Sequence, residues 1–360
     1  MDLVWNETNI SSGNHSPNLG ERSADHIIRS IWLSVVFAFG TVGNVLLFSV
    51  ILRKGRITNV TNLFNLNLAI ADLVRIFLFI PVYLFYSAYD SWPVELGLAG
   101  CKSVFLILQN SLTVSILTLL FMSIERFRAV VHPLRKQMSI RVARCLVVLS
   151  WFLGFIASVW YSIAVTLVTN DDGHAHCQPG SKGTFVTTGL LLLITGTQWL
   201  PGAAFTITYM RIILKLRRDA VIKPSDVSQS SQNRHRRNLR AARILVIEVL
   251  FFLGCLYPFY HYSLATAMGD GESPGLLSLD GTVIFCMMIT FSLTNPFCHI
   301  LLNSEFREDV RRIFQQIKSG LGNRSIRNWS EINLPGWHVH RDKETSGQNE
   351  ERHNTNGSGK

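Results

Sequence analysis

The stretch Glu125-Arg126-Phe127, followed by Val131-His132-Pro133-Leu134, lies where the third of seven long apolar segments meets a basic loop. An acid–arginine pair at the end of a membrane-length helix is partly desolvated, and such a pair is strong until one partner is removed. An isolated arginine there would more simply be an interfacial cation that snorkels to water. A charged pair fixed at one end of a membrane-length helix instead predicts a switch that faces one side of a bilayer.

The composition indicates a membrane protein. Of 360 residues, 48% are hydrophobic and only 16% are charged, whereas soluble globular proteins carry about 25% charged residues. Each apolar segment reaches the roughly 20 residues that cross about 30 Å of hydrocarbon as a helix, and a backbone in lipid must satisfy its own hydrogen bonds. A soluble all-helical protein would not carry seven such runs in succession. We therefore predict an all-α membrane protein with a seven-transmembrane helix bundle, whose spans are residues 27–52, 62–86, 101–131, 143–168, 187–216, 240–266 and 281–302.

Charge is distributed unevenly between the loops. Basic residues such as Arg53, Arg135 and Arg217 follow the first, third and fifth segments, whereas the opposite loops carry acids such as Asp171 and Asp270. The positive-inside rule places the basic loops in the cytoplasm, so we expect a multi-pass plasma-membrane protein with an extracellular N-terminus and a cytoplasmic C-terminus. The net charge of +10 is thus a topology signal. Nucleic-acid binding is a poor alternative, because the basic residues are split among separate loops and a tail.

Four parts are expected along the chain. Residues 1–26 form an extracellular tail without a cleavable signal peptide, and residues 27–302 form the bundle. Residues 303–318 form a short amphipathic helix on the cytoplasmic membrane surface, in contact with membrane lipids. Residues 319–360 are polar and are expected to form a disordered cytoplasmic tail.

Two features belong to the side that we expect to be extracellular. Asn6, Asn9 and Asn14 begin glycosylation sequons in the N-terminal tail. Cys101 begins the third segment and Cys177 lies in the second outer loop. Both cysteines would face an oxidising space, which favours a disulfide between them.

Polar residues inside the spans each need a reason, since polar groups are costly in a bilayer. Asn44 lies in the first span, Asp72 in the second, and Asn295 precedes Pro296 in the seventh. Together with Glu125-Arg126-Phe127, they resemble the rhodopsin-like (class A) family of G-protein-coupled receptors, in its peptide-receptor branch. The resemblance covers about residues 27–314 and rests on markers in the correct order along the spans: Gly43-Asn44-Val45, Asp72, Cys101, Arg126, Trp151, Pro201 with Tyr209, Phe252 with Pro258, and Asn295-Pro296.

The resemblance implies signalling without catalysis and without a cofactor. An extracellular ligand would bind between the helices and favour a conformation whose cytoplasmic end opens, chiefly by outward movement of the sixth helix. A heterotrimeric G protein would then bind there and exchange its nucleotide. The ligand drives this change only through its differential affinity for the two states. The implied switch residues are Glu125, Arg126, Tyr209, Asn295, Pro296 and His299.

The chain departs from the family pattern at relay positions. Leu256 stands where the family has a sixth-span tryptophan, His299 replaces the tyrosine of the seventh-span motif, and Phe127 replaces the tyrosine after the acid–arginine pair. The first two changes put the usual relay between ligand and G protein in doubt. A protein with the receptor fold that no longer couples is therefore an alternative.

A further departure concerns the sodium pocket that the resemblance implies at Asp72. Arg75 follows Asp72 by three residues, on the same helical face. We predict that Arg75 folds toward Asp72 and supplies the positive charge that sodium would bring. The alternatives are that Arg75 snorkels or that it binds an anionic group of the ligand. The implied polar core consists of Asn44, Asp72, Arg75, Ser115, Ser292 and Asn295.

The residues also bear on the ligand. Leu108, next to Gln109, stands where aminergic receptors carry an aspartate, and the seventh span has no lysine for retinal. Acidic outer loops would attract a cationic peptide, so a peptide is the leading hypothesis, with a small molecule or lipid as the alternative. A transporter would show repeat halves, and none is visible. The candidate pocket residues are Leu108, Gln109, Leu256 and Tyr257.

The inner side offers candidate regulatory sites. Phosphates added there would supply charge that arrestin-like partners bind. Receptor kinases and arrestin are therefore expected partners beside the G protein, although the same residues are ordinary components of disordered segments. The candidates are Ser225, Ser228, Ser230, Ser231, Ser319, Ser325, Ser330, Thr345 and Ser346.

Overall fold

The computed structural model describes residues 19–53, 57, 59–89, 91–132, 134–169, 175–179, 184–221, 229–268 and 279–318. The sequons at Asn6, Asn9 and Asn14, and the tail from residue 319, lie outside these residues. Contacts divide the chain into a main unit, residues 1–310, and a second unit, residues 311–360. The functional residues discussed below all belong to the main unit.

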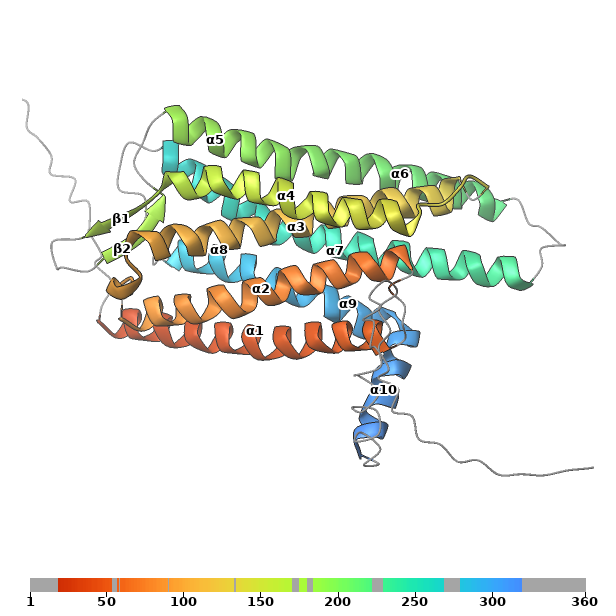
Figure 1. The fold of residues 1–360 in the computed structure, drawn as a ribbon, viewed down its shortest axis with the longest axis horizontal. Helices are drawn as coiled ribbons and strands as arrows, with labels where there is room; N and C mark the ends of the chain where they lie inside the picture. The colour runs from red at the N-terminus through yellow and green to blue at the C-terminus, as the bar shows by residue number, and fades with distance from the viewer. Residues whose placement is uncertain are drawn as a thin grey trace, which may run out of the picture. The chain divides into compact units, whose positions relative to one another are not determined.

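Helices account for nearly all of the described residues of the main unit. Helices α5 and α6 are joined by a π-helical turn, η3, and helices α8 and α9 by a 3-10 turn, η4, so that each pair forms one rod. The rods run side by side in Figure 1. The helices are α1 (Leu19–Arg53), α2 (Val60–Tyr89), η2 (Val94–Leu96), α3 (Gly97–Val131), α4 (Ile140–Ala164), α5 (Thr184–Ile194), η3 (Thr195–Trp199), α6 (Leu200–Val221), α7 (Gln229–Met268), α8 (Leu279–Thr290), η4 (Phe291–Leu293), α9 (Thr294–Leu302) and α10 (Ser304–Lys318).

Seven rods therefore match the seven predicted segments. Five of the described helices are both long and apolar enough to cross a membrane, at residues 27–53, 60–86, 97–131, 140–164 and 283–302. The two remaining rods are α5–α6, which the π-helical turn divides, and α7, whose first turns are rich in basic residues. The prediction of a helical membrane protein is confirmed.

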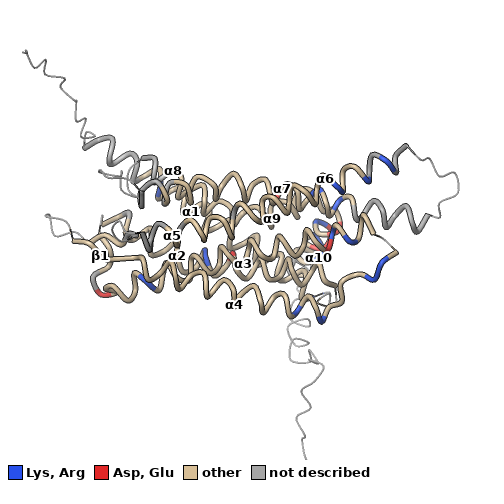
Figure 2. Tube along the Cα trace, turned by 90° about the horizontal axis from the view of Figure 1, so that it is seen from above, with Lys and Arg blue, Asp and Glu red and all other residues tan. Residues whose placement is uncertain are grey.

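The flanks of the rods are apolar where a soluble protein would be polar. Large side chains are widely exposed there, including Phe39 at 70%, Val148 at 69% and Leu192 at 67%. Contiguous exposed apolar surface on this scale is expected of a face that meets lipid rather than water. Charged residues gather toward the ends of the rods, with most of the basic ones at the end where α6 finishes and α7 begins (Figure 2).

The fourth predicted segment is wrong at its end. Helix α4 stops at Ala164, and Val165–Thr169 forms strand β1, which pairs antiparallel with β2 (Ala175–Pro179). The run Val165 to Thr169 is rich in β-branched residues, which favour an extended backbone. Its partner strand contains Cys177, which is bonded to Cys101 at the start of α3. The hairpin is thus held against the bundle by a covalent link.

Two helices begin eight or more residues earlier than their apolar segments predict. Helix α1 starts at Leu19 rather than at Ile27, and α7 starts at Gln229 rather than at Arg240. In both, polar residues continue the helix beyond the apolar stretch. Hydropathy marks where a helix can lie in hydrocarbon, whereas helical hydrogen bonding does not stop at that boundary. Helix α10 lies where residues 303–318 were predicted to form an amphipathic helix.

Candidate functional site

Arg126 lies in the last turns of α3 and is held by two partners. Its Nε atom is 2.7 Å from Oε2 of Glu125, and the two side chains are 11% and 13% exposed. Its Nη2 atom also donates a hydrogen bond to Oγ1 of Thr61 in α2. The predicted acid–arginine pair is therefore present, and Arg126 additionally links α3 to α2. Thr61 was not foreseen, because only the packing of α2 against α3 brings it there.

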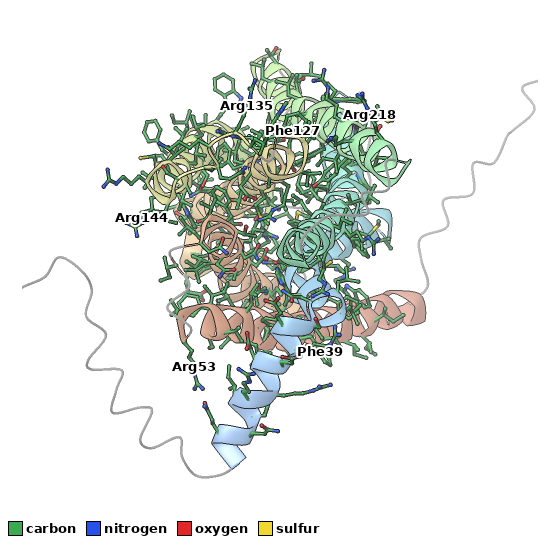
Figure 3. All side chains as sticks on the ribbon, turned by 90° about the vertical axis from the view of Figure 1, so that its right-hand side faces the viewer. Phe39, Arg53, Phe127, Arg135, Arg144 and Arg218 are labelled. Carbon is green, nitrogen blue, oxygen red and sulfur yellow. A yellow bond between two sulfur atoms is a disulfide. The ribbon has the colours of Figure 1, made fainter. Side chains whose placement is uncertain are left out.

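A cavity of about 350 Å³ opens beside this pair. Its lining includes Thr61, Arg126, Ile244 and His299, so that α2, α3, α7 and α9 all contribute. Figure 3 looks onto this end of the main unit, which we call the Arg126 end; Arg135, Arg144 and Arg218 are labelled there. The cavity gives Arg126 room to change partners if the surrounding helices separate.

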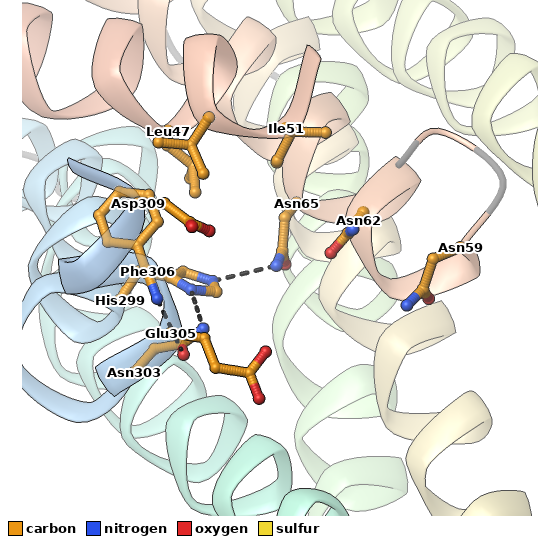
Figure 4. A pocket seen from close by; sticks show the side chains of 11 residues that line it. Leu47, Ile51, Asn59, Asn62, Asn65, His299, Asn303, Glu305, Phe306 and Asp309 are labelled. Carbon is orange, nitrogen blue, oxygen red and sulfur yellow. Dashed lines mark hydrogen bonds between the residues drawn. The ribbon is translucent and has the colours of Figure 1, made fainter. Parts of the chain in front are cut away.

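His299 occupies the boundary between this cavity and a second one of about 380 Å³ (Figure 4). Its Nε2 atom lies 3.0 Å from Nδ2 of Asn65, and its Nδ1 atom lies 3.4 Å from Nδ2 of Asn303. The ring also contacts Phe306, at 5.7 Å between centroids. A side chain that substitutes for the family's tyrosine thus ties α9 to α2 and to the start of α10.

The remaining predicted switch residues are buried but lie on different elements. Tyr209 in α6 is 9% exposed, and Asn295 in α9 is 5% exposed. Neither amide atom of Asn295 has a hydrogen-bond partner among the described residues. Pro296 packs so closely on Gly43 that a β-carbon at that glycine would lie 2.8 Å from the proline ring. A glycine is therefore needed where α1 meets α9.

The predicted polar core is assembled around Arg75. Arg75 is fully buried, and its Nη1 atom lies 3.3 Å from Oδ1 of Asp72. It donates hydrogen bonds from Nη1 to Oγ of Ser292 at 2.9 Å and from Nη2 to Oγ of Ser115 at 3.0 Å. The guanidinium carbon also lies 5.6 Å from the centroid of the Phe291 ring, within the range of a cation–π contact.

Asn44 completes this core from α1. Its Nδ2 atom donates to the backbone oxygens of Gly40 and of Ser292, each at 3.0 Å. Ser292 lies in η4, and Pro296, four residues further on, has no N–H to donate to its carbonyl group. Asn44 therefore satisfies a backbone acceptor that the interrupted helix would otherwise leave buried and unpaired.

The residues present do not fit a bound sodium ion. The oxygens that the resemblance implies as ligands at Asp72, Ser115 and Ser292 already accept from, or pair with, the Arg75 guanidinium. A second cation beside a buried guanidinium would add like-charge repulsion in a region of low dielectric. Arg75 itself therefore supplies the positive charge of this core. No group of three or more metal-ligating acids, histidines and cysteines occurs elsewhere in the described residues.

The opposite end carries the disulfide, and we call it the disulfide end. Cys101 and Cys177 are bonded, as predicted. Strand β2 is also tied to α2 and its following loop: the hydroxyl of Tyr86 lies 2.8 Å from Nδ1 of His176, and the amide of Trp92 donates to the carbonyl of Ala175 at 2.6 Å. The β-hairpin is thus fixed over this end of the bundle.

Aromatic rings fill the interior beneath the hairpin. The rings of Tyr83 and Phe285 stack at 4.0 Å, Phe79 lies 5.0 Å from Phe285, and Phe105 lies 6.3 Å from Phe79. A small cavity of about 20 Å³ lies beside Phe79, Tyr83 and Trp92. Sequence reasoning missed this cluster, because aromatic residues in a membrane span give no local signal of whether they face lipid or the interior.

The four candidate pocket residues do not share one surface. Leu108, Gln109 and Leu256 are buried, at 3%, 1% and 0% exposure. Nε2 of Gln109 donates to the hydroxyl of Tyr260 at 3.0 Å, a partner that sequence reasoning did not single out. Tyr257 is 46% exposed and packs on His261, with 3.9 Å between the ring centroids. Tyr257 therefore lies apart from the other three.

Comparison with known proteins places this geometry in a family. A family model described as "7 transmembrane receptor (rhodopsin family)" matches residues 43–299. Somatostatin receptor type 2 from Sus scrofa is 27% identical over 326 residues, which cover 88% of this chain and 85% of the relative. Galanin receptor type 2 from Rattus norvegicus is 28% identical over 291 residues, 80% and 76% of the two chains. Neuropeptide FF receptor 1 from Homo sapiens is 26% identical over 299 residues, 78% and 68%. The chain belongs to the rhodopsin family of seven-transmembrane receptors, which are signalling receptors and not enzymes.

Proposed function

We propose that this receptor binds an extracellular peptide at the disulfide end and activates a heterotrimeric G protein at the Arg126 end. The observation that carries the proposal is the partly buried Glu125–Arg126 pair beside a cavity of about 350 Å³. An arginine held by one acid and one hydroxyl at the mouth of a cavity has a defined resting position and room for a second one. That is the minimum that a two-state switch requires.

The proposed orientation places the Arg126 end in the cytoplasm. Basic residues concentrate there, including Arg135, Arg144 and Arg218 (Figure 3), as the positive-inside rule expects of a cytoplasmic surface. The disulfide at the other end is consistent with an oxidising, extracellular space. The N-terminal sequons at Asn6, Asn9 and Asn14 would then be accessible to glycosylation.

The peptide class is supported by the relatives and by the form of the disulfide end. The somatostatin, galanin and neuropeptide FF receptors are, by name, receptors for peptides. In this chain the β-hairpin is fixed to α3 by the disulfide and to α2 by the contact between Tyr86 and His176. An extended peptide would contact both the hairpin and the ends of the neighbouring helices.

A reconstitution experiment tests the proposed function. The parent and Arg126→Leu are expressed with an N-terminal epitope, and antibody staining of intact cells measures surface delivery and orientation together. Nucleotide exchange is then measured on a panel of purified heterotrimers, with libraries of peptides, lipids and amines as ligands. We expect exchange with a peptide and the parent, and loss of exchange with Arg126→Leu at equal surface staining.

Other outcomes of that experiment identify the alternatives. Activation by lipids or amines alone would overturn the peptide class while leaving the receptor function intact. Exchange that is the same for the parent and Arg126→Leu would contradict the proposed switch. A protein that reaches the surface yet activates no heterotrimer would be a receptor fold without coupling, for which the Leu256 and His299 replacements are the physical grounds.

Receptor kinases and arrestin are further proposed partners. Ser225, Ser228 and the tail serines lie outside the described residues, so their support comes from the sequence alone. Membrane lipids are the proposed contact of the apolar stripe of α10, on which Phe314 is 57% exposed.

A further inference from the structure

Glu248 is a buried acid for which the switch described above has no use. It lies in α7 and is 1% exposed, and neither of its carboxyl oxygens has a hydrogen-bond partner among the described residues. A buried carboxyl group without a partner is destabilising whether or not it is ionised, because either form loses hydrogen bonds to water. We call the arrangement in which Glu125 and Thr61 hold Arg126 the closed arrangement. In it, the carboxyl group of Glu248 lacks a hydrogen-bond donor among the described residues.

The groups that face Glu248 come from three neighbouring elements. It interacts electrostatically with Asp72 of α2, Tyr209 of α6 and Cys298 of α9. Asp72 is committed to Arg75. A cation that could pair with Glu248 must therefore come from elsewhere.

Arg126 is the cation in the best position to do so. Ile244 and Leu245 line the same cavity as Arg126, and Glu248 follows them by four and three residues, one helical turn deeper on the same face of α7. Tyr209 interacts electrostatically with both Arg126 and Glu248. The arginine and the acid thus share Tyr209 as a neighbour, and Glu248 lies one turn beyond the α7 residues that line the cavity. Arg126 itself is engaged with Glu125 and Thr61 in the closed arrangement.

We propose that Glu248 is a positioning residue for Arg126: when the Arg126 end opens, the Arg126 guanidinium leaves Glu125 and Thr61 and pairs with Glu248. This pair holds Arg126 in the cavity where the G protein binds. The inference rests on the proposed function, in which a G protein binds at this end. The carboxyl group exchanges an orphaned state for a charge-assisted hydrogen bond, and such bonds are about twice as strong as neutral ones. Glu248 therefore favours the open state in two ways. Its unpaired carboxyl group destabilises the closed state, and its pair with Arg126 stabilises the open state.

The test measures the affinity of purified receptor for a nucleotide-free heterotrimer, taken from the panel above, so that no ligand is required. Glu248→Leu and the near-isosteric Glu248→Gln are compared with the parent, and Val249→Ala, at the adjacent buried position, is the control for a packing defect. We expect at least a tenfold weaker affinity for Glu248→Leu and Glu248→Gln, with a midpoint of thermal unfolding at or above that of the parent. Glu248→Asp is expected to recover part of the loss.

A double-mutant cycle separates pairing from packing. Arg126→Gln removes the cation and is expected to weaken heterotrimer binding by itself, and adding Glu248→Gln to it is expected to change the affinity less than twofold, because the pair is already absent. Independent, multiplicative losses would overturn the proposal, as would parental affinity in Glu248→Gln. The proposal would also be overturned if the Glu248 variants lost heterotrimer affinity together with thermal stability, and if Val249→Ala showed the same two losses. If Arg126→Leu leaves nucleotide exchange intact, the proposed function itself fails; loss in Arg126→Leu with no effect of Glu248→Gln removes only this inference.

Discussion

Replacing Arg75 by leucine is expected to lower the free energy of unfolding by about 3–5 kcal/mol, the usual cost of leaving one member of a buried ion pair alone. Asp72 would remain 2% exposed with its cation removed, and the hydroxyls of Ser115 and Ser292 would lose their donor. Thermal unfolding of the detergent-purified receptor measures the effect. Loss of the native fold in Arg75→Leu alone is compatible with this expectation, so the informative comparison is with a compensated variant.

The compensated variant is Arg75→Leu combined with Asp72→Asn. Removing both charges of a buried pair costs much less than removing one, and is often neutral. We therefore expect the double variant to recover most of the lost stability. Two losses that simply add would show that Arg75 and Asp72 do not interact, which would contradict the 3.3 Å pair.

The contacts of Arg75 also predict how sodium affects the thermal stability of the receptor. In the parent, replacing potassium chloride by sodium chloride at constant ionic strength should leave the midpoint of thermal unfolding unchanged, because the guanidinium already holds Asp72, Ser115 and Ser292. In Arg75→Ala, those oxygens are released around a vacated space, and sodium should raise the midpoint by binding the folded state. A sodium effect in the parent would mean that Arg75 does not supply the cation of this core.

Replacing Glu125 by glutamine is expected to raise ligand-independent nucleotide exchange by roughly 5- to 30-fold, which corresponds to about 1–2 kcal/mol. The magnitude lies between the values for exposed and buried ion pairs, since the two side chains are 13% and 11% exposed. The closed state loses its ion pair, whereas the open state, in which Arg126 has left Glu125, loses little. Exchange on a fixed amount of purified receptor is the measurement.

Thr61→Val serves as the companion to Glu125→Gln. It removes the hydroxyl that accepts from Arg126 but keeps the shape of the side chain. A neutral hydrogen-bond partner contributes less than a charged one, so we expect a smaller rise in the same direction. A fall in basal exchange for either variant would show that these contacts support the open state and not the closed one.

The sequence predicted those features that arise within one helix or from one pair of residues. Arg75 and Asp72 are three residues apart on α2, and Glu125 adjoins Arg126, so that helical geometry alone brings the partners together. The Cys101–Cys177 disulfide followed from the common side on which both cysteines were expected to lie. Each of these required only a local rule or the topology of the spans.

Features that depend on packing between helices were not foreseen. Thr61 reaches Arg126, and Asn65 reaches His299, only because α2 lies against α3 and α9 at a particular depth and rotation. Strand β1, up to Val168, was taken for the end of a helix, because hydropathy does not distinguish a helix end from an apolar strand. Tyr257 was predicted as a pocket residue together with Leu256, yet Tyr257 is 46% exposed and Leu256 is fully buried, because the two adjacent residues lie on different faces of α7.

The two replaced relay positions are structurally satisfied in the closed arrangement. Leu256 is fully buried, and His299 bonds to Asn65 across α2 and α9. With Arg75 supplying the cation of the polar core, and Glu248 proposed as the open-state partner of Arg126, this receptor retains the family's architecture and exchanges several of its contacts.

The distance between α4 and α7 at the Arg126 end tests the central claim most directly. Cys145 is an exposed free cysteine in α4, and Arg243→Cys adds a second label site on an exposed position of α7. The other free cysteines, Cys255, Cys286 and Cys298, are replaced, and nitroxide labels report the distance by pulsed electron spin resonance. We expect the distance distribution of the parent to shift to longer distances when a nucleotide-free heterotrimer binds. Without a G protein, we expect Glu125→Gln to populate these longer distances more than the parent does. An unchanged distribution in receptor that catalyses nucleotide exchange would contradict a switch that works by opening this end.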